Sequence, residues 1–162
     1  MGAVTYPHEQ VNQFLRERFI CLRVNEDSKA QETAEVLRKY RLLWSPGFVF
    51  LDWQGNELRR VVGYLPPGDF LAELHFALGM VAMLHARYAE SFEHFRGAAD
   101  GAPTPPVAPE ALYWAGIAAF RRDGRKIEII RQHWEEIRRR FAGSTWWTRA
   151  DVFDVTPPGR ES

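Results

Sequence analysis

The chain has 162 residues, of which 46% are hydrophobic and 14% aromatic, so it is long and apolar enough for one ordinary domain or two small ones. Its 21 basic and 21 acidic side chains balance, which gives it no electrostatic footprint for a nucleic-acid partner. Cys21 is the single cysteine, so the chain holds no C-x-x-C redox pair, internal disulfide or cysteine zinc site.

The first half of the chain alternates helical and strand patterns. Apolar spacing predicts a helix over residues 7–18, a buried strand over 19–25 (FICLRVN) and a second helix over 32–40. After a break at Ser45-Pro46-Gly47, the pattern predicts a strand over 48–51, a hairpin turn over 52–56, a return strand over 57–64 and a helix that starts near Leu65.

The second half is predicted to be entirely helical. The first helix is expected to end near His85, the second to cover 89–99 and the third to start at Pro109. A fourth helix is expected over 127–141, followed by a last short helix capped by Ser144 or Thr145. We divide the chain into a domain over residues 1–78, a helical region over 79–153 and a flexible tail over 154–162.

The first half resembles the thioredoxin superfamily over roughly residues 3–80. The resemblance rests on the strand at 19–25, the helix at 32–40, the Trp44-Ser45-Pro46-Gly47 break with its following hairpin, and the helix start at 66–71. Pro46 falls where the family places a cis-proline that faces the redox site, and residues 3–7 resemble the segment that follows the catalytic C-x-x-C. The resemblance implies a partial thioredoxin-like α/β unit with the order β-α-β-β-α.

The second half resembles tetratricopeptide repeats, as an all-α helical hairpin region. One repeat matches through Leu78-Gly79, Ala82, Tyr88, Ser91, Phe95 and Ala98, and a looser copy through Leu112, Ala115 and Gly116. Gly79 and Gly116 lie 37 residues apart, close to the period of about 34 residues. We expect the two glycines to allow close helix approach, with large side chains filling the space between helices.

The thioredoxin resemblance leaves one strand unaccounted for. In the family a strand that leads into the C-x-x-C helix lies between the equivalents of 19–25 and 48–51, and this chain starts inside that helix. Three arrangements are open: direct pairing of the two strands in a three-stranded sheet, a strand supplied by a second copy or another protein, or a longer product. Unpaired edges are prone to association.

Other chemical motifs give little support for an enzyme. Cys21 lies between Ile20 and Leu22, so we expect a buried or half-buried structural cysteine. The five histidines show no H-x-x-x-H or H-E-x-x-H spacing, and no G-x-S-x-G, P-loop or G-x-G-x-x-G occurs. We therefore predict no catalytic residue, no metal site and no cofactor.

The sequence predicts a non-catalytic protein-interaction module. In the thioredoxin family the residue before the cis-proline offers backbone groups to an extended bound chain, so the contact candidates are Trp44, Ser45, Pro46 and Gly47. Trp146 and Trp147 join them because adjacent residues cannot share one helix face. The expected partner is a protein, a peptide or a second copy.

Two other functions remain open on the sequence. The chain is either part of a thiol–disulfide oxidoreductase whose C-x-x-C lies upstream of Met1, or a structural subunit of a larger assembly. We find no signal peptide and expect no membrane span, since the apolar run at 76–84 is interrupted and short. A soluble, cytoplasmic protein is expected, unless a secretion signal precedes Met1.

Overall fold

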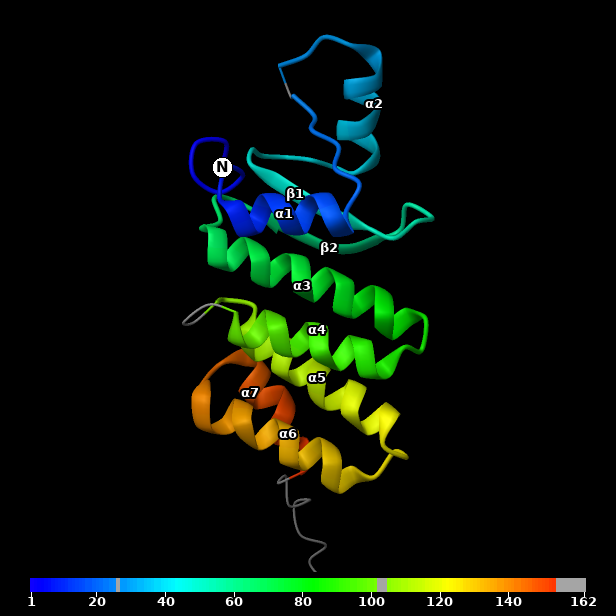
Figure 1. Ribbon diagram of the computed structural model, residues 1–162, viewed down its shortest axis with the longest axis vertical. Coiled ribbons are helices and arrows are strands. Elements are labelled where there is room, and N and C mark those ends of the chain that lie inside the picture. Colours follow the sequence, from blue (N-terminus) through cyan, green and yellow to red (C-terminus); the bar gives the residue numbers. More distant parts are fainter. Residues whose placement is uncertain (26, 102–104, 154–162) are drawn as a thin grey trace, which may run out of the picture. The chain divides into compact units, whose positions relative to one another are not determined.

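The computed structural model describes residues 1–25, 27–101 and 105–153 (Figure 1). Its elements are α1 (Glu9–Arg18), α2 (Gln31–Lys39), β1 (Gly47–Leu51), β2 (Glu57–Val62), α3 (Pro67–Leu84), α4 (Tyr88–Asp100), α5 (Ala108–Arg122), α6 (Ile127–Arg140), α7 (Thr145–Ala150) and a short 3-10 helix (Asp151–Phe153). The predicted flexible tail lies outside the described residues.

The chain forms two compact units, Met1–Leu71 and Ala72–Ser162, and the boundary between them falls inside α3. The predicted boundary at residue 78 lies in the same helix. The first unit contains the sheet and the second is helical. Each unit has its own pattern of burial.

An antiparallel hairpin of β1 and β2 is the sheet of the first unit. Asp52 closes its turn, because its carboxylate accepts hydrogen bonds from the backbone N–H groups of Gln54 and Asn56 at 2.9 and 2.8 Å. Gly55 has a φ of 84°, which favours glycine. The predicted hairpin is thus confirmed, with a return strand that ends at Val62.

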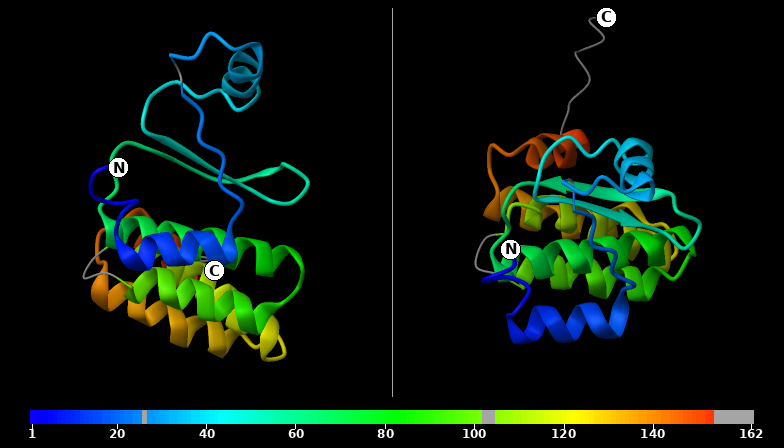
Figure 2. Two further views of the ribbon diagram at one scale, coloured as in Figure 1. Left: turned by 45° about the horizontal axis from the view of Figure 1, so that its top comes forward. Right: turned by 90° about the horizontal axis from the view of Figure 1, so that it is seen from above.

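The helices α1 and α2 lie on opposite sides of this hairpin (Figure 2). On the side of α1, the ring of Phe19 meets that of Phe50, with centroids 6.4 Å apart. On the side of α2, the guanidinium of Arg60 donates to the backbone carbonyl oxygens of Tyr40 and Arg41. The hairpin is therefore held by aromatic contacts on one side and by hydrogen bonds on the other.

The predicted buried strand over residues 19–25 is wrong. This segment is neither helix nor strand, and the described residues form a two-stranded sheet, so the β-α-β-β-α order loses its first strand and no three-stranded sheet forms. Ile20, Cys21 and Leu22 are exposed, which also corrects the expected burial of Cys21. The apolar composition favours a strand, but a strand needs a paired neighbour to supply its hydrogen bonds.

Successive antiparallel helices pack side by side in the second unit (Figure 1). Its core consists largely of small and aromatic side chains from these helices: Phe76, Phe95, Ala98, Ala111, Leu112, Ala115, Ala118, Trp134 and Ile137. The sequence signals for helix starts are seen here. Pro109 lies in the first turn of α5, and the Ser144 Oγ accepts a hydrogen bond from the Trp147 N–H at 3.0 Å.

Two glycines bring the helices of this unit into close contact. A Cβ placed on Gly79 would lie 2.7 Å from a ring carbon of Phe95, and one on Gly116 would lie 2.6 Å from the Nε1 of Trp134. The hydroxyl of Ser91 donates to the carbonyl oxygen of Gly79 at 2.9 Å. The expected close approach at both glycines is therefore present, with aromatic rings against the bare backbone.

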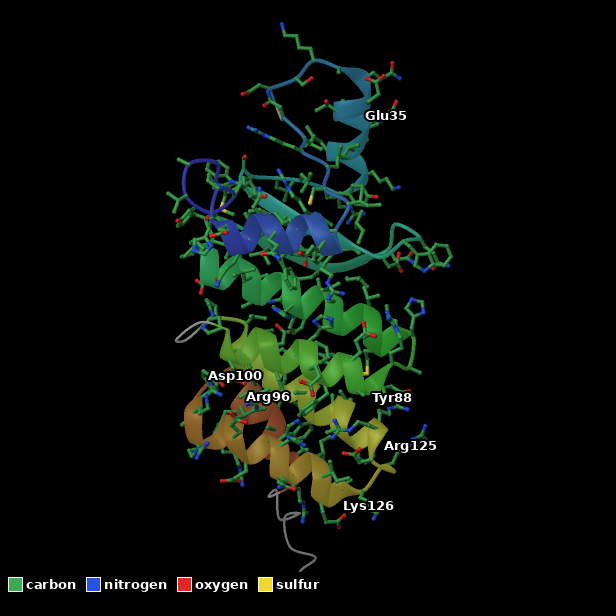
Figure 3. The ribbon with its side chains drawn as sticks, in the orientation of Figure 1. Glu35, Tyr88, Arg96, Asp100, Arg125 and Lys126 are labelled. Atoms are coloured by element: carbon green, nitrogen blue, oxygen red, sulfur yellow. The ribbon has the colours of Figure 1, made fainter. Side chains whose placement is uncertain are left out.

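An ion-pair network joins α4 and α6, and Figure 3 labels two of its members, Arg96 and Asp100. Arg96 bonds to Asp100 and Glu136 at 2.7 and 2.5 Å, and Arg140 bonds to the same two carboxylates at 3.0 and 2.6 Å. Burial raises the pKa of the Glu136 carboxyl, but the hydrogen bonds and charges of the two arginines outweigh it, so its pKa lies below the usual 4.5.

The helix α3 is more continuous than the sequence pattern indicates. Of the helices in the described residues, α3 is the one whose length and composition would let it cross a membrane. Within this helix, 44% is buried inside the protein. Buried core helices of soluble proteins share these properties. The expectation that no segment is long enough to span a membrane therefore does not hold on length and composition alone.

Gly116→Ala is predicted to destabilise the second unit by about 1–3 kcal/mol, because the added methyl collides with the buried ring of Trp134. Urea unfolding followed by tryptophan fluorescence measures the change. Alanine in an unobstructed helix stabilises relative to glycine by up to about 1 kcal/mol. A stabilised variant would therefore contradict the close contact.

Glu136→Gln is predicted to weaken the protein at neutral pH and to flatten its loss of stability in acid. The folded pKa of Glu136 lies below its unfolded value, so its stabilising effect is complete above about pH 4.5 and disappears as the pH falls further. Urea midpoints between neutral pH and pH 3 measure this. The matched control is Glu135→Gln, whose side chain is 67% exposed and which should behave as wild type.

Candidate functional site

The loop before β1 exposes a tryptophan beside a tightly fixed backbone. The side chains of Leu43 and Trp44 are 91% and 71% exposed. The Ser45–Pro46 peptide bond is cis, in agreement with the position that the resemblance assigns to Pro46. A Cβ on Gly47 would lie 2.9 Å from the carbonyl oxygen of Trp44, so the loop has no room for a side chain there.

The hydrogen-bonding pattern of the hairpin shows which backbone groups face outward from β1. The Gly63 N–H donates to the Pro46 carbonyl oxygen at 2.8 Å, and hydrogen-bonded pairs recur at every second residue of an antiparallel ladder. Phe48 therefore pairs with Val61, and the N–H and C=O groups of Val49 point away from β2. No strand of the described chain pairs with this outer edge.

Exposed apolar side chains are concentrated in the first unit. Among the described residues, this unit holds Val4, Tyr6, Ile20, Leu22, Leu43, Trp44, Leu51, Trp53, Val62 and Tyr64, whereas the second unit holds Leu84, Ile127 and Val152. Soluble proteins rarely leave so many large apolar groups together on one small unit without a partner. Most of the exposed large apolar side chains of the described residues therefore lie in the first unit.

The amphipathic helix α2 is part of the same incomplete burial. Its apolar residues Val36 and Leu37 are only half-buried, and none of its residues is fully buried. A helix of nine residues gains most of its stability from packing of its apolar face. The apolar face of α2 is therefore only partly covered, just as the outer edge of β1 is unpaired.

Cys21 is accessible but lacks the electrostatic features that activate a catalytic thiol. It is exposed, and desolvation raises the pKa of its thiol above the ordinary value. A nucleophilic cysteine needs a nearby cation, a helix N-terminus or a metal that lowers the pKa. The sequence holds no second cysteine for exchange. The arrangement around Cys21 therefore favours no covalent chemistry.

The two tryptophans of α7 lie against the core of the second unit. Trp146 and Trp147 are both half-buried there. The ring of Trp146 contacts that of Tyr113 at a centroid distance of 5.1 Å, and the guanidinium of Arg149 lies over it at 4.3 Å. Both remain partly open to a partner, but the structure places them far less exposed than Trp44.

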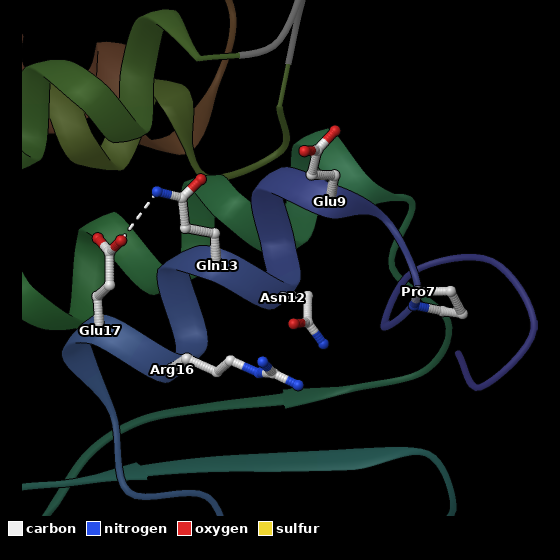
Figure 4. Close-up of a pocket in the computed structure, with 6 residues that line it drawn as sticks. All are labelled: Pro7, Glu9, Asn12, Gln13, Arg16 and Glu17. Carbon is white, nitrogen blue, oxygen red and sulfur yellow. Dashed lines mark hydrogen bonds between the residues drawn. The ribbon is translucent and has the colours of Figure 1, made fainter.

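A shallow hollow follows the outer face of α1 (Figure 4). It is lined by Pro7, Glu9, Asn12, Gln13, Arg16 and Glu17, all exposed. Gln13 donates to Glu17 along the same helix at 2.8 Å. Because a single helix and the turn before it form the whole hollow, it has no converging groups to enclose a ligand.

The structure brings together two histidines that the sequence spacing does not single out. His75 and His94 place their Nδ1 atoms 3.3 Å apart between α3 and α4. Across residues 1–25, 27–101 and 105–153, no three His, Cys, Asp or Glu side chains gather as metal ligands. Helical spacing alone cannot reveal such a pair, because it depends on how two helices cross.

Comparison with known protein families gives a match for the first half of the chain. Residues 3–78 match the family model of a thioredoxin-like domain. No curated protein and no solved structure matches the chain. The family match supports a thioredoxin-like domain over residues 3–78, a range that includes β1 and the cis Ser45–Pro46 loop.

Trp44→Ala is predicted to leave the free energy of unfolding within about 0.5 kcal/mol of wild type, because this side chain is mostly exposed. Trp134→Ala is the matched contrast: that ring is 5% exposed, and its removal should cost about 3–5 kcal/mol. Urea unfolding of both variants measures the difference. A large loss for Trp44→Ala would mean that this ring supports the fold rather than a contact.

Proposed function

We propose that this protein is a non-catalytic interaction module that binds an extended segment of a partner protein along the outer edge of β1. The bound segment adds as a strand, and the Trp44–Gly47 loop lies at the beginning of the strand edge. In strand addition the main-chain hydrogen bonds supply affinity and the neighbouring side chains supply selectivity. Trp44, which is 71% exposed at the beginning of this edge, is the candidate for that second role.

The contrast between the two strands of the hairpin carries this proposal. β2 contains Glu57, Arg59 and Arg60, and charged side chains are a common protection of a sheet edge. β1, with the sequence GFVFL, has no charged residue. The open edge of β1 is therefore the unprotected one, which supports a role in pairing.

The helical second unit is proposed to be tetratricopeptide-like and to contribute further partner contacts. Support comes from the antiparallel helices and from the matched contacts of Gly79 with Phe95 and of Gly116 with Trp134. Helical repeats of this kind present side chains to peptides and proteins. Trp146 and Trp147 are its candidate contacts.

An oxidoreductase is the main rival function. Under it, a longer product carries a C-x-x-C pair upstream of Met1, and the Pro46 loop shapes the substrate site. The match to a thioredoxin-like domain favours this rival as a class. The coding sequence upstream of Met1 separates the two functions, because an in-frame C-x-x-C there would favour the enzyme. A structural subunit would instead copurify with a constant set of partners.

The strand-addition proposal predicts that peptides selected from a random displayed library will bind wild type and lose binding in Val49→Pro. Proline removes the outward N–H of Val49 without touching the ladder to β2. Isothermal titration with synthetic forms of the selected peptides measures the loss, expected to be at least about tenfold in Kd.

The matched control is Val62→Pro. Val62 pairs with Gly47, so its N–H points to the opposite edge of the hairpin, and its side chain is 56% exposed. This variant should bind the peptides as wild type does. Equal effects of the two prolines on peptide binding would contradict strand addition at β1.

A further inference from the structure

Residues 19–25 form an extended apolar segment that no strand of the described chain pairs with. The side chains of Ile20 and Leu22 are 105% and 77% exposed. Successive side chains of an extended chain point to opposite sides, so Ile20, Leu22 and Val24 would line one face of a strand. The segment thus has the pattern of a half-buried strand without its sheet.

Within one copy this segment does not follow β1. It leads from α1 on one side of the hairpin to α2 on the other, and in both views of Figure 2 it runs across the strands. The ring of Phe19, its first residue, contacts the ring of Phe50 in β1, with centroids 6.4 Å apart. From Ile20 to Arg23 the segment is exposed.

We propose that two copies of this chain exchange these segments, so that residues 19–25 of each copy add as a strand to the outer edge of β1 in the other. The inference rests on the strand-addition function proposed above and names its first occupant. Each copy carries one donor segment and one acceptor edge. A two-fold exchange therefore fills both acceptor edges at once and uses the same contact twice.

Charge favours pairing between copies. The donor segment has one charged residue, Arg23, and β1 has none, so no like charges are forced together across the new pair. The carboxylate of Asp52 follows directly after β1, and hydrogen bonds from Asn56 hold its pKa below the usual range. The acceptor edge therefore ends at an ionised acidic group, which complements the basic side chain of the donor.

Exposed apolar side chains on the donor segment and beside the acceptor edge supply part of the area that such a dimer needs. Standard interfaces bury about 800 Å² from each partner. Ile20 and Leu22 would be covered on the donor, and Trp44, at the beginning of the acceptor edge, can contribute up to about 150–250 Å² as one large aromatic side chain. Apolar burial and new backbone hydrogen bonds then act together.

The test is the mass of the full chain in solution, measured by sedimentation equilibrium from about 1 to about 100 μM. Wild type should form dimers. The donor variant Ile20→Lys/Leu22→Lys and the acceptor variant Val49→Pro should each weaken dimerisation at least about tenfold. Val62→Pro, on the opposite edge of the hairpin, should dimerise as wild type.

Mixing the donor and acceptor variants provides the sharpest check. One intact donor and one intact acceptor remain in the mixture, so a mixed dimer with a single exchange should form where neither variant dimerises alone. Cys21 lies in the middle of the donor segment and serves as a native probe. Its alkylation by N-ethylmaleimide should slow in the wild-type dimer and stay fast in the acceptor variant.

A wild-type chain that stays monomeric over this range would overturn the exchange, and so would a dimer that Val49→Pro leaves intact or a mixture that fails to form mixed dimers. Protection of the Val49 N–H from hydrogen exchange in the monomer would also overturn it, because the edge would then be filled within one copy. Peptide binding to the donor variant, which has a free acceptor edge, tests the proposed function separately.

Discussion

The outer edge of β1 is the constraint on which the first unit depends. A two-stranded hairpin is marginal in water, and here it is supported by ring contacts such as that of Phe48 with Phe70, at 5.0 Å, and by Arg60 on its other side. The ladder ends at β1, and the segment over residues 19–25 does not pair with that edge. The exposure of Ile20 and the absence of buried residues in α2 both follow from this one missing pairing.

The second unit reaches burial by a different route. Its helices carry alanine and glycine where they touch, and aromatic rings such as that of Phe95 cover the bare backbone. Polar groups are satisfied within the unit, since Ser91 donates to the Gly79 carbonyl and Trp134 Nε1 donates to the Tyr113 carbonyl. Each apolar helix face thus has a neighbour that is adjacent in sequence, which explains why this unit completes its own core.

This difference also explains what the sequence could predict. Signals that act over a few residues succeeded: Asp52 and Gly55 in the hairpin turn, Ser144 at a helix start, and the spacing of Gly79 and Gly116. Residues 19–25 have strand composition too, but a strand also needs a partner far along the chain or outside it. Local propensity cannot reveal a missing partner, so the segment and the burial of Cys21 were predicted wrongly.

The candidate site was predictable to the same extent. Trp44 and Pro46 stand out as a break before a strand, and the loop lies where the resemblance places it. Which backbone groups of β1 face outward depends on the register with β2, and that register follows from a hydrogen bond between Pro46 and Gly63 that no sequence pattern encodes. The same register makes Val49 and Val62 distinguishable: one proline substitution removes a donor from the uncharged edge, and the other removes a donor from the edge that β2 protects with charge. The two edges of the hairpin are therefore chemically different, since β1 carries no charged residue and β2 carries Glu57, Arg59 and Arg60.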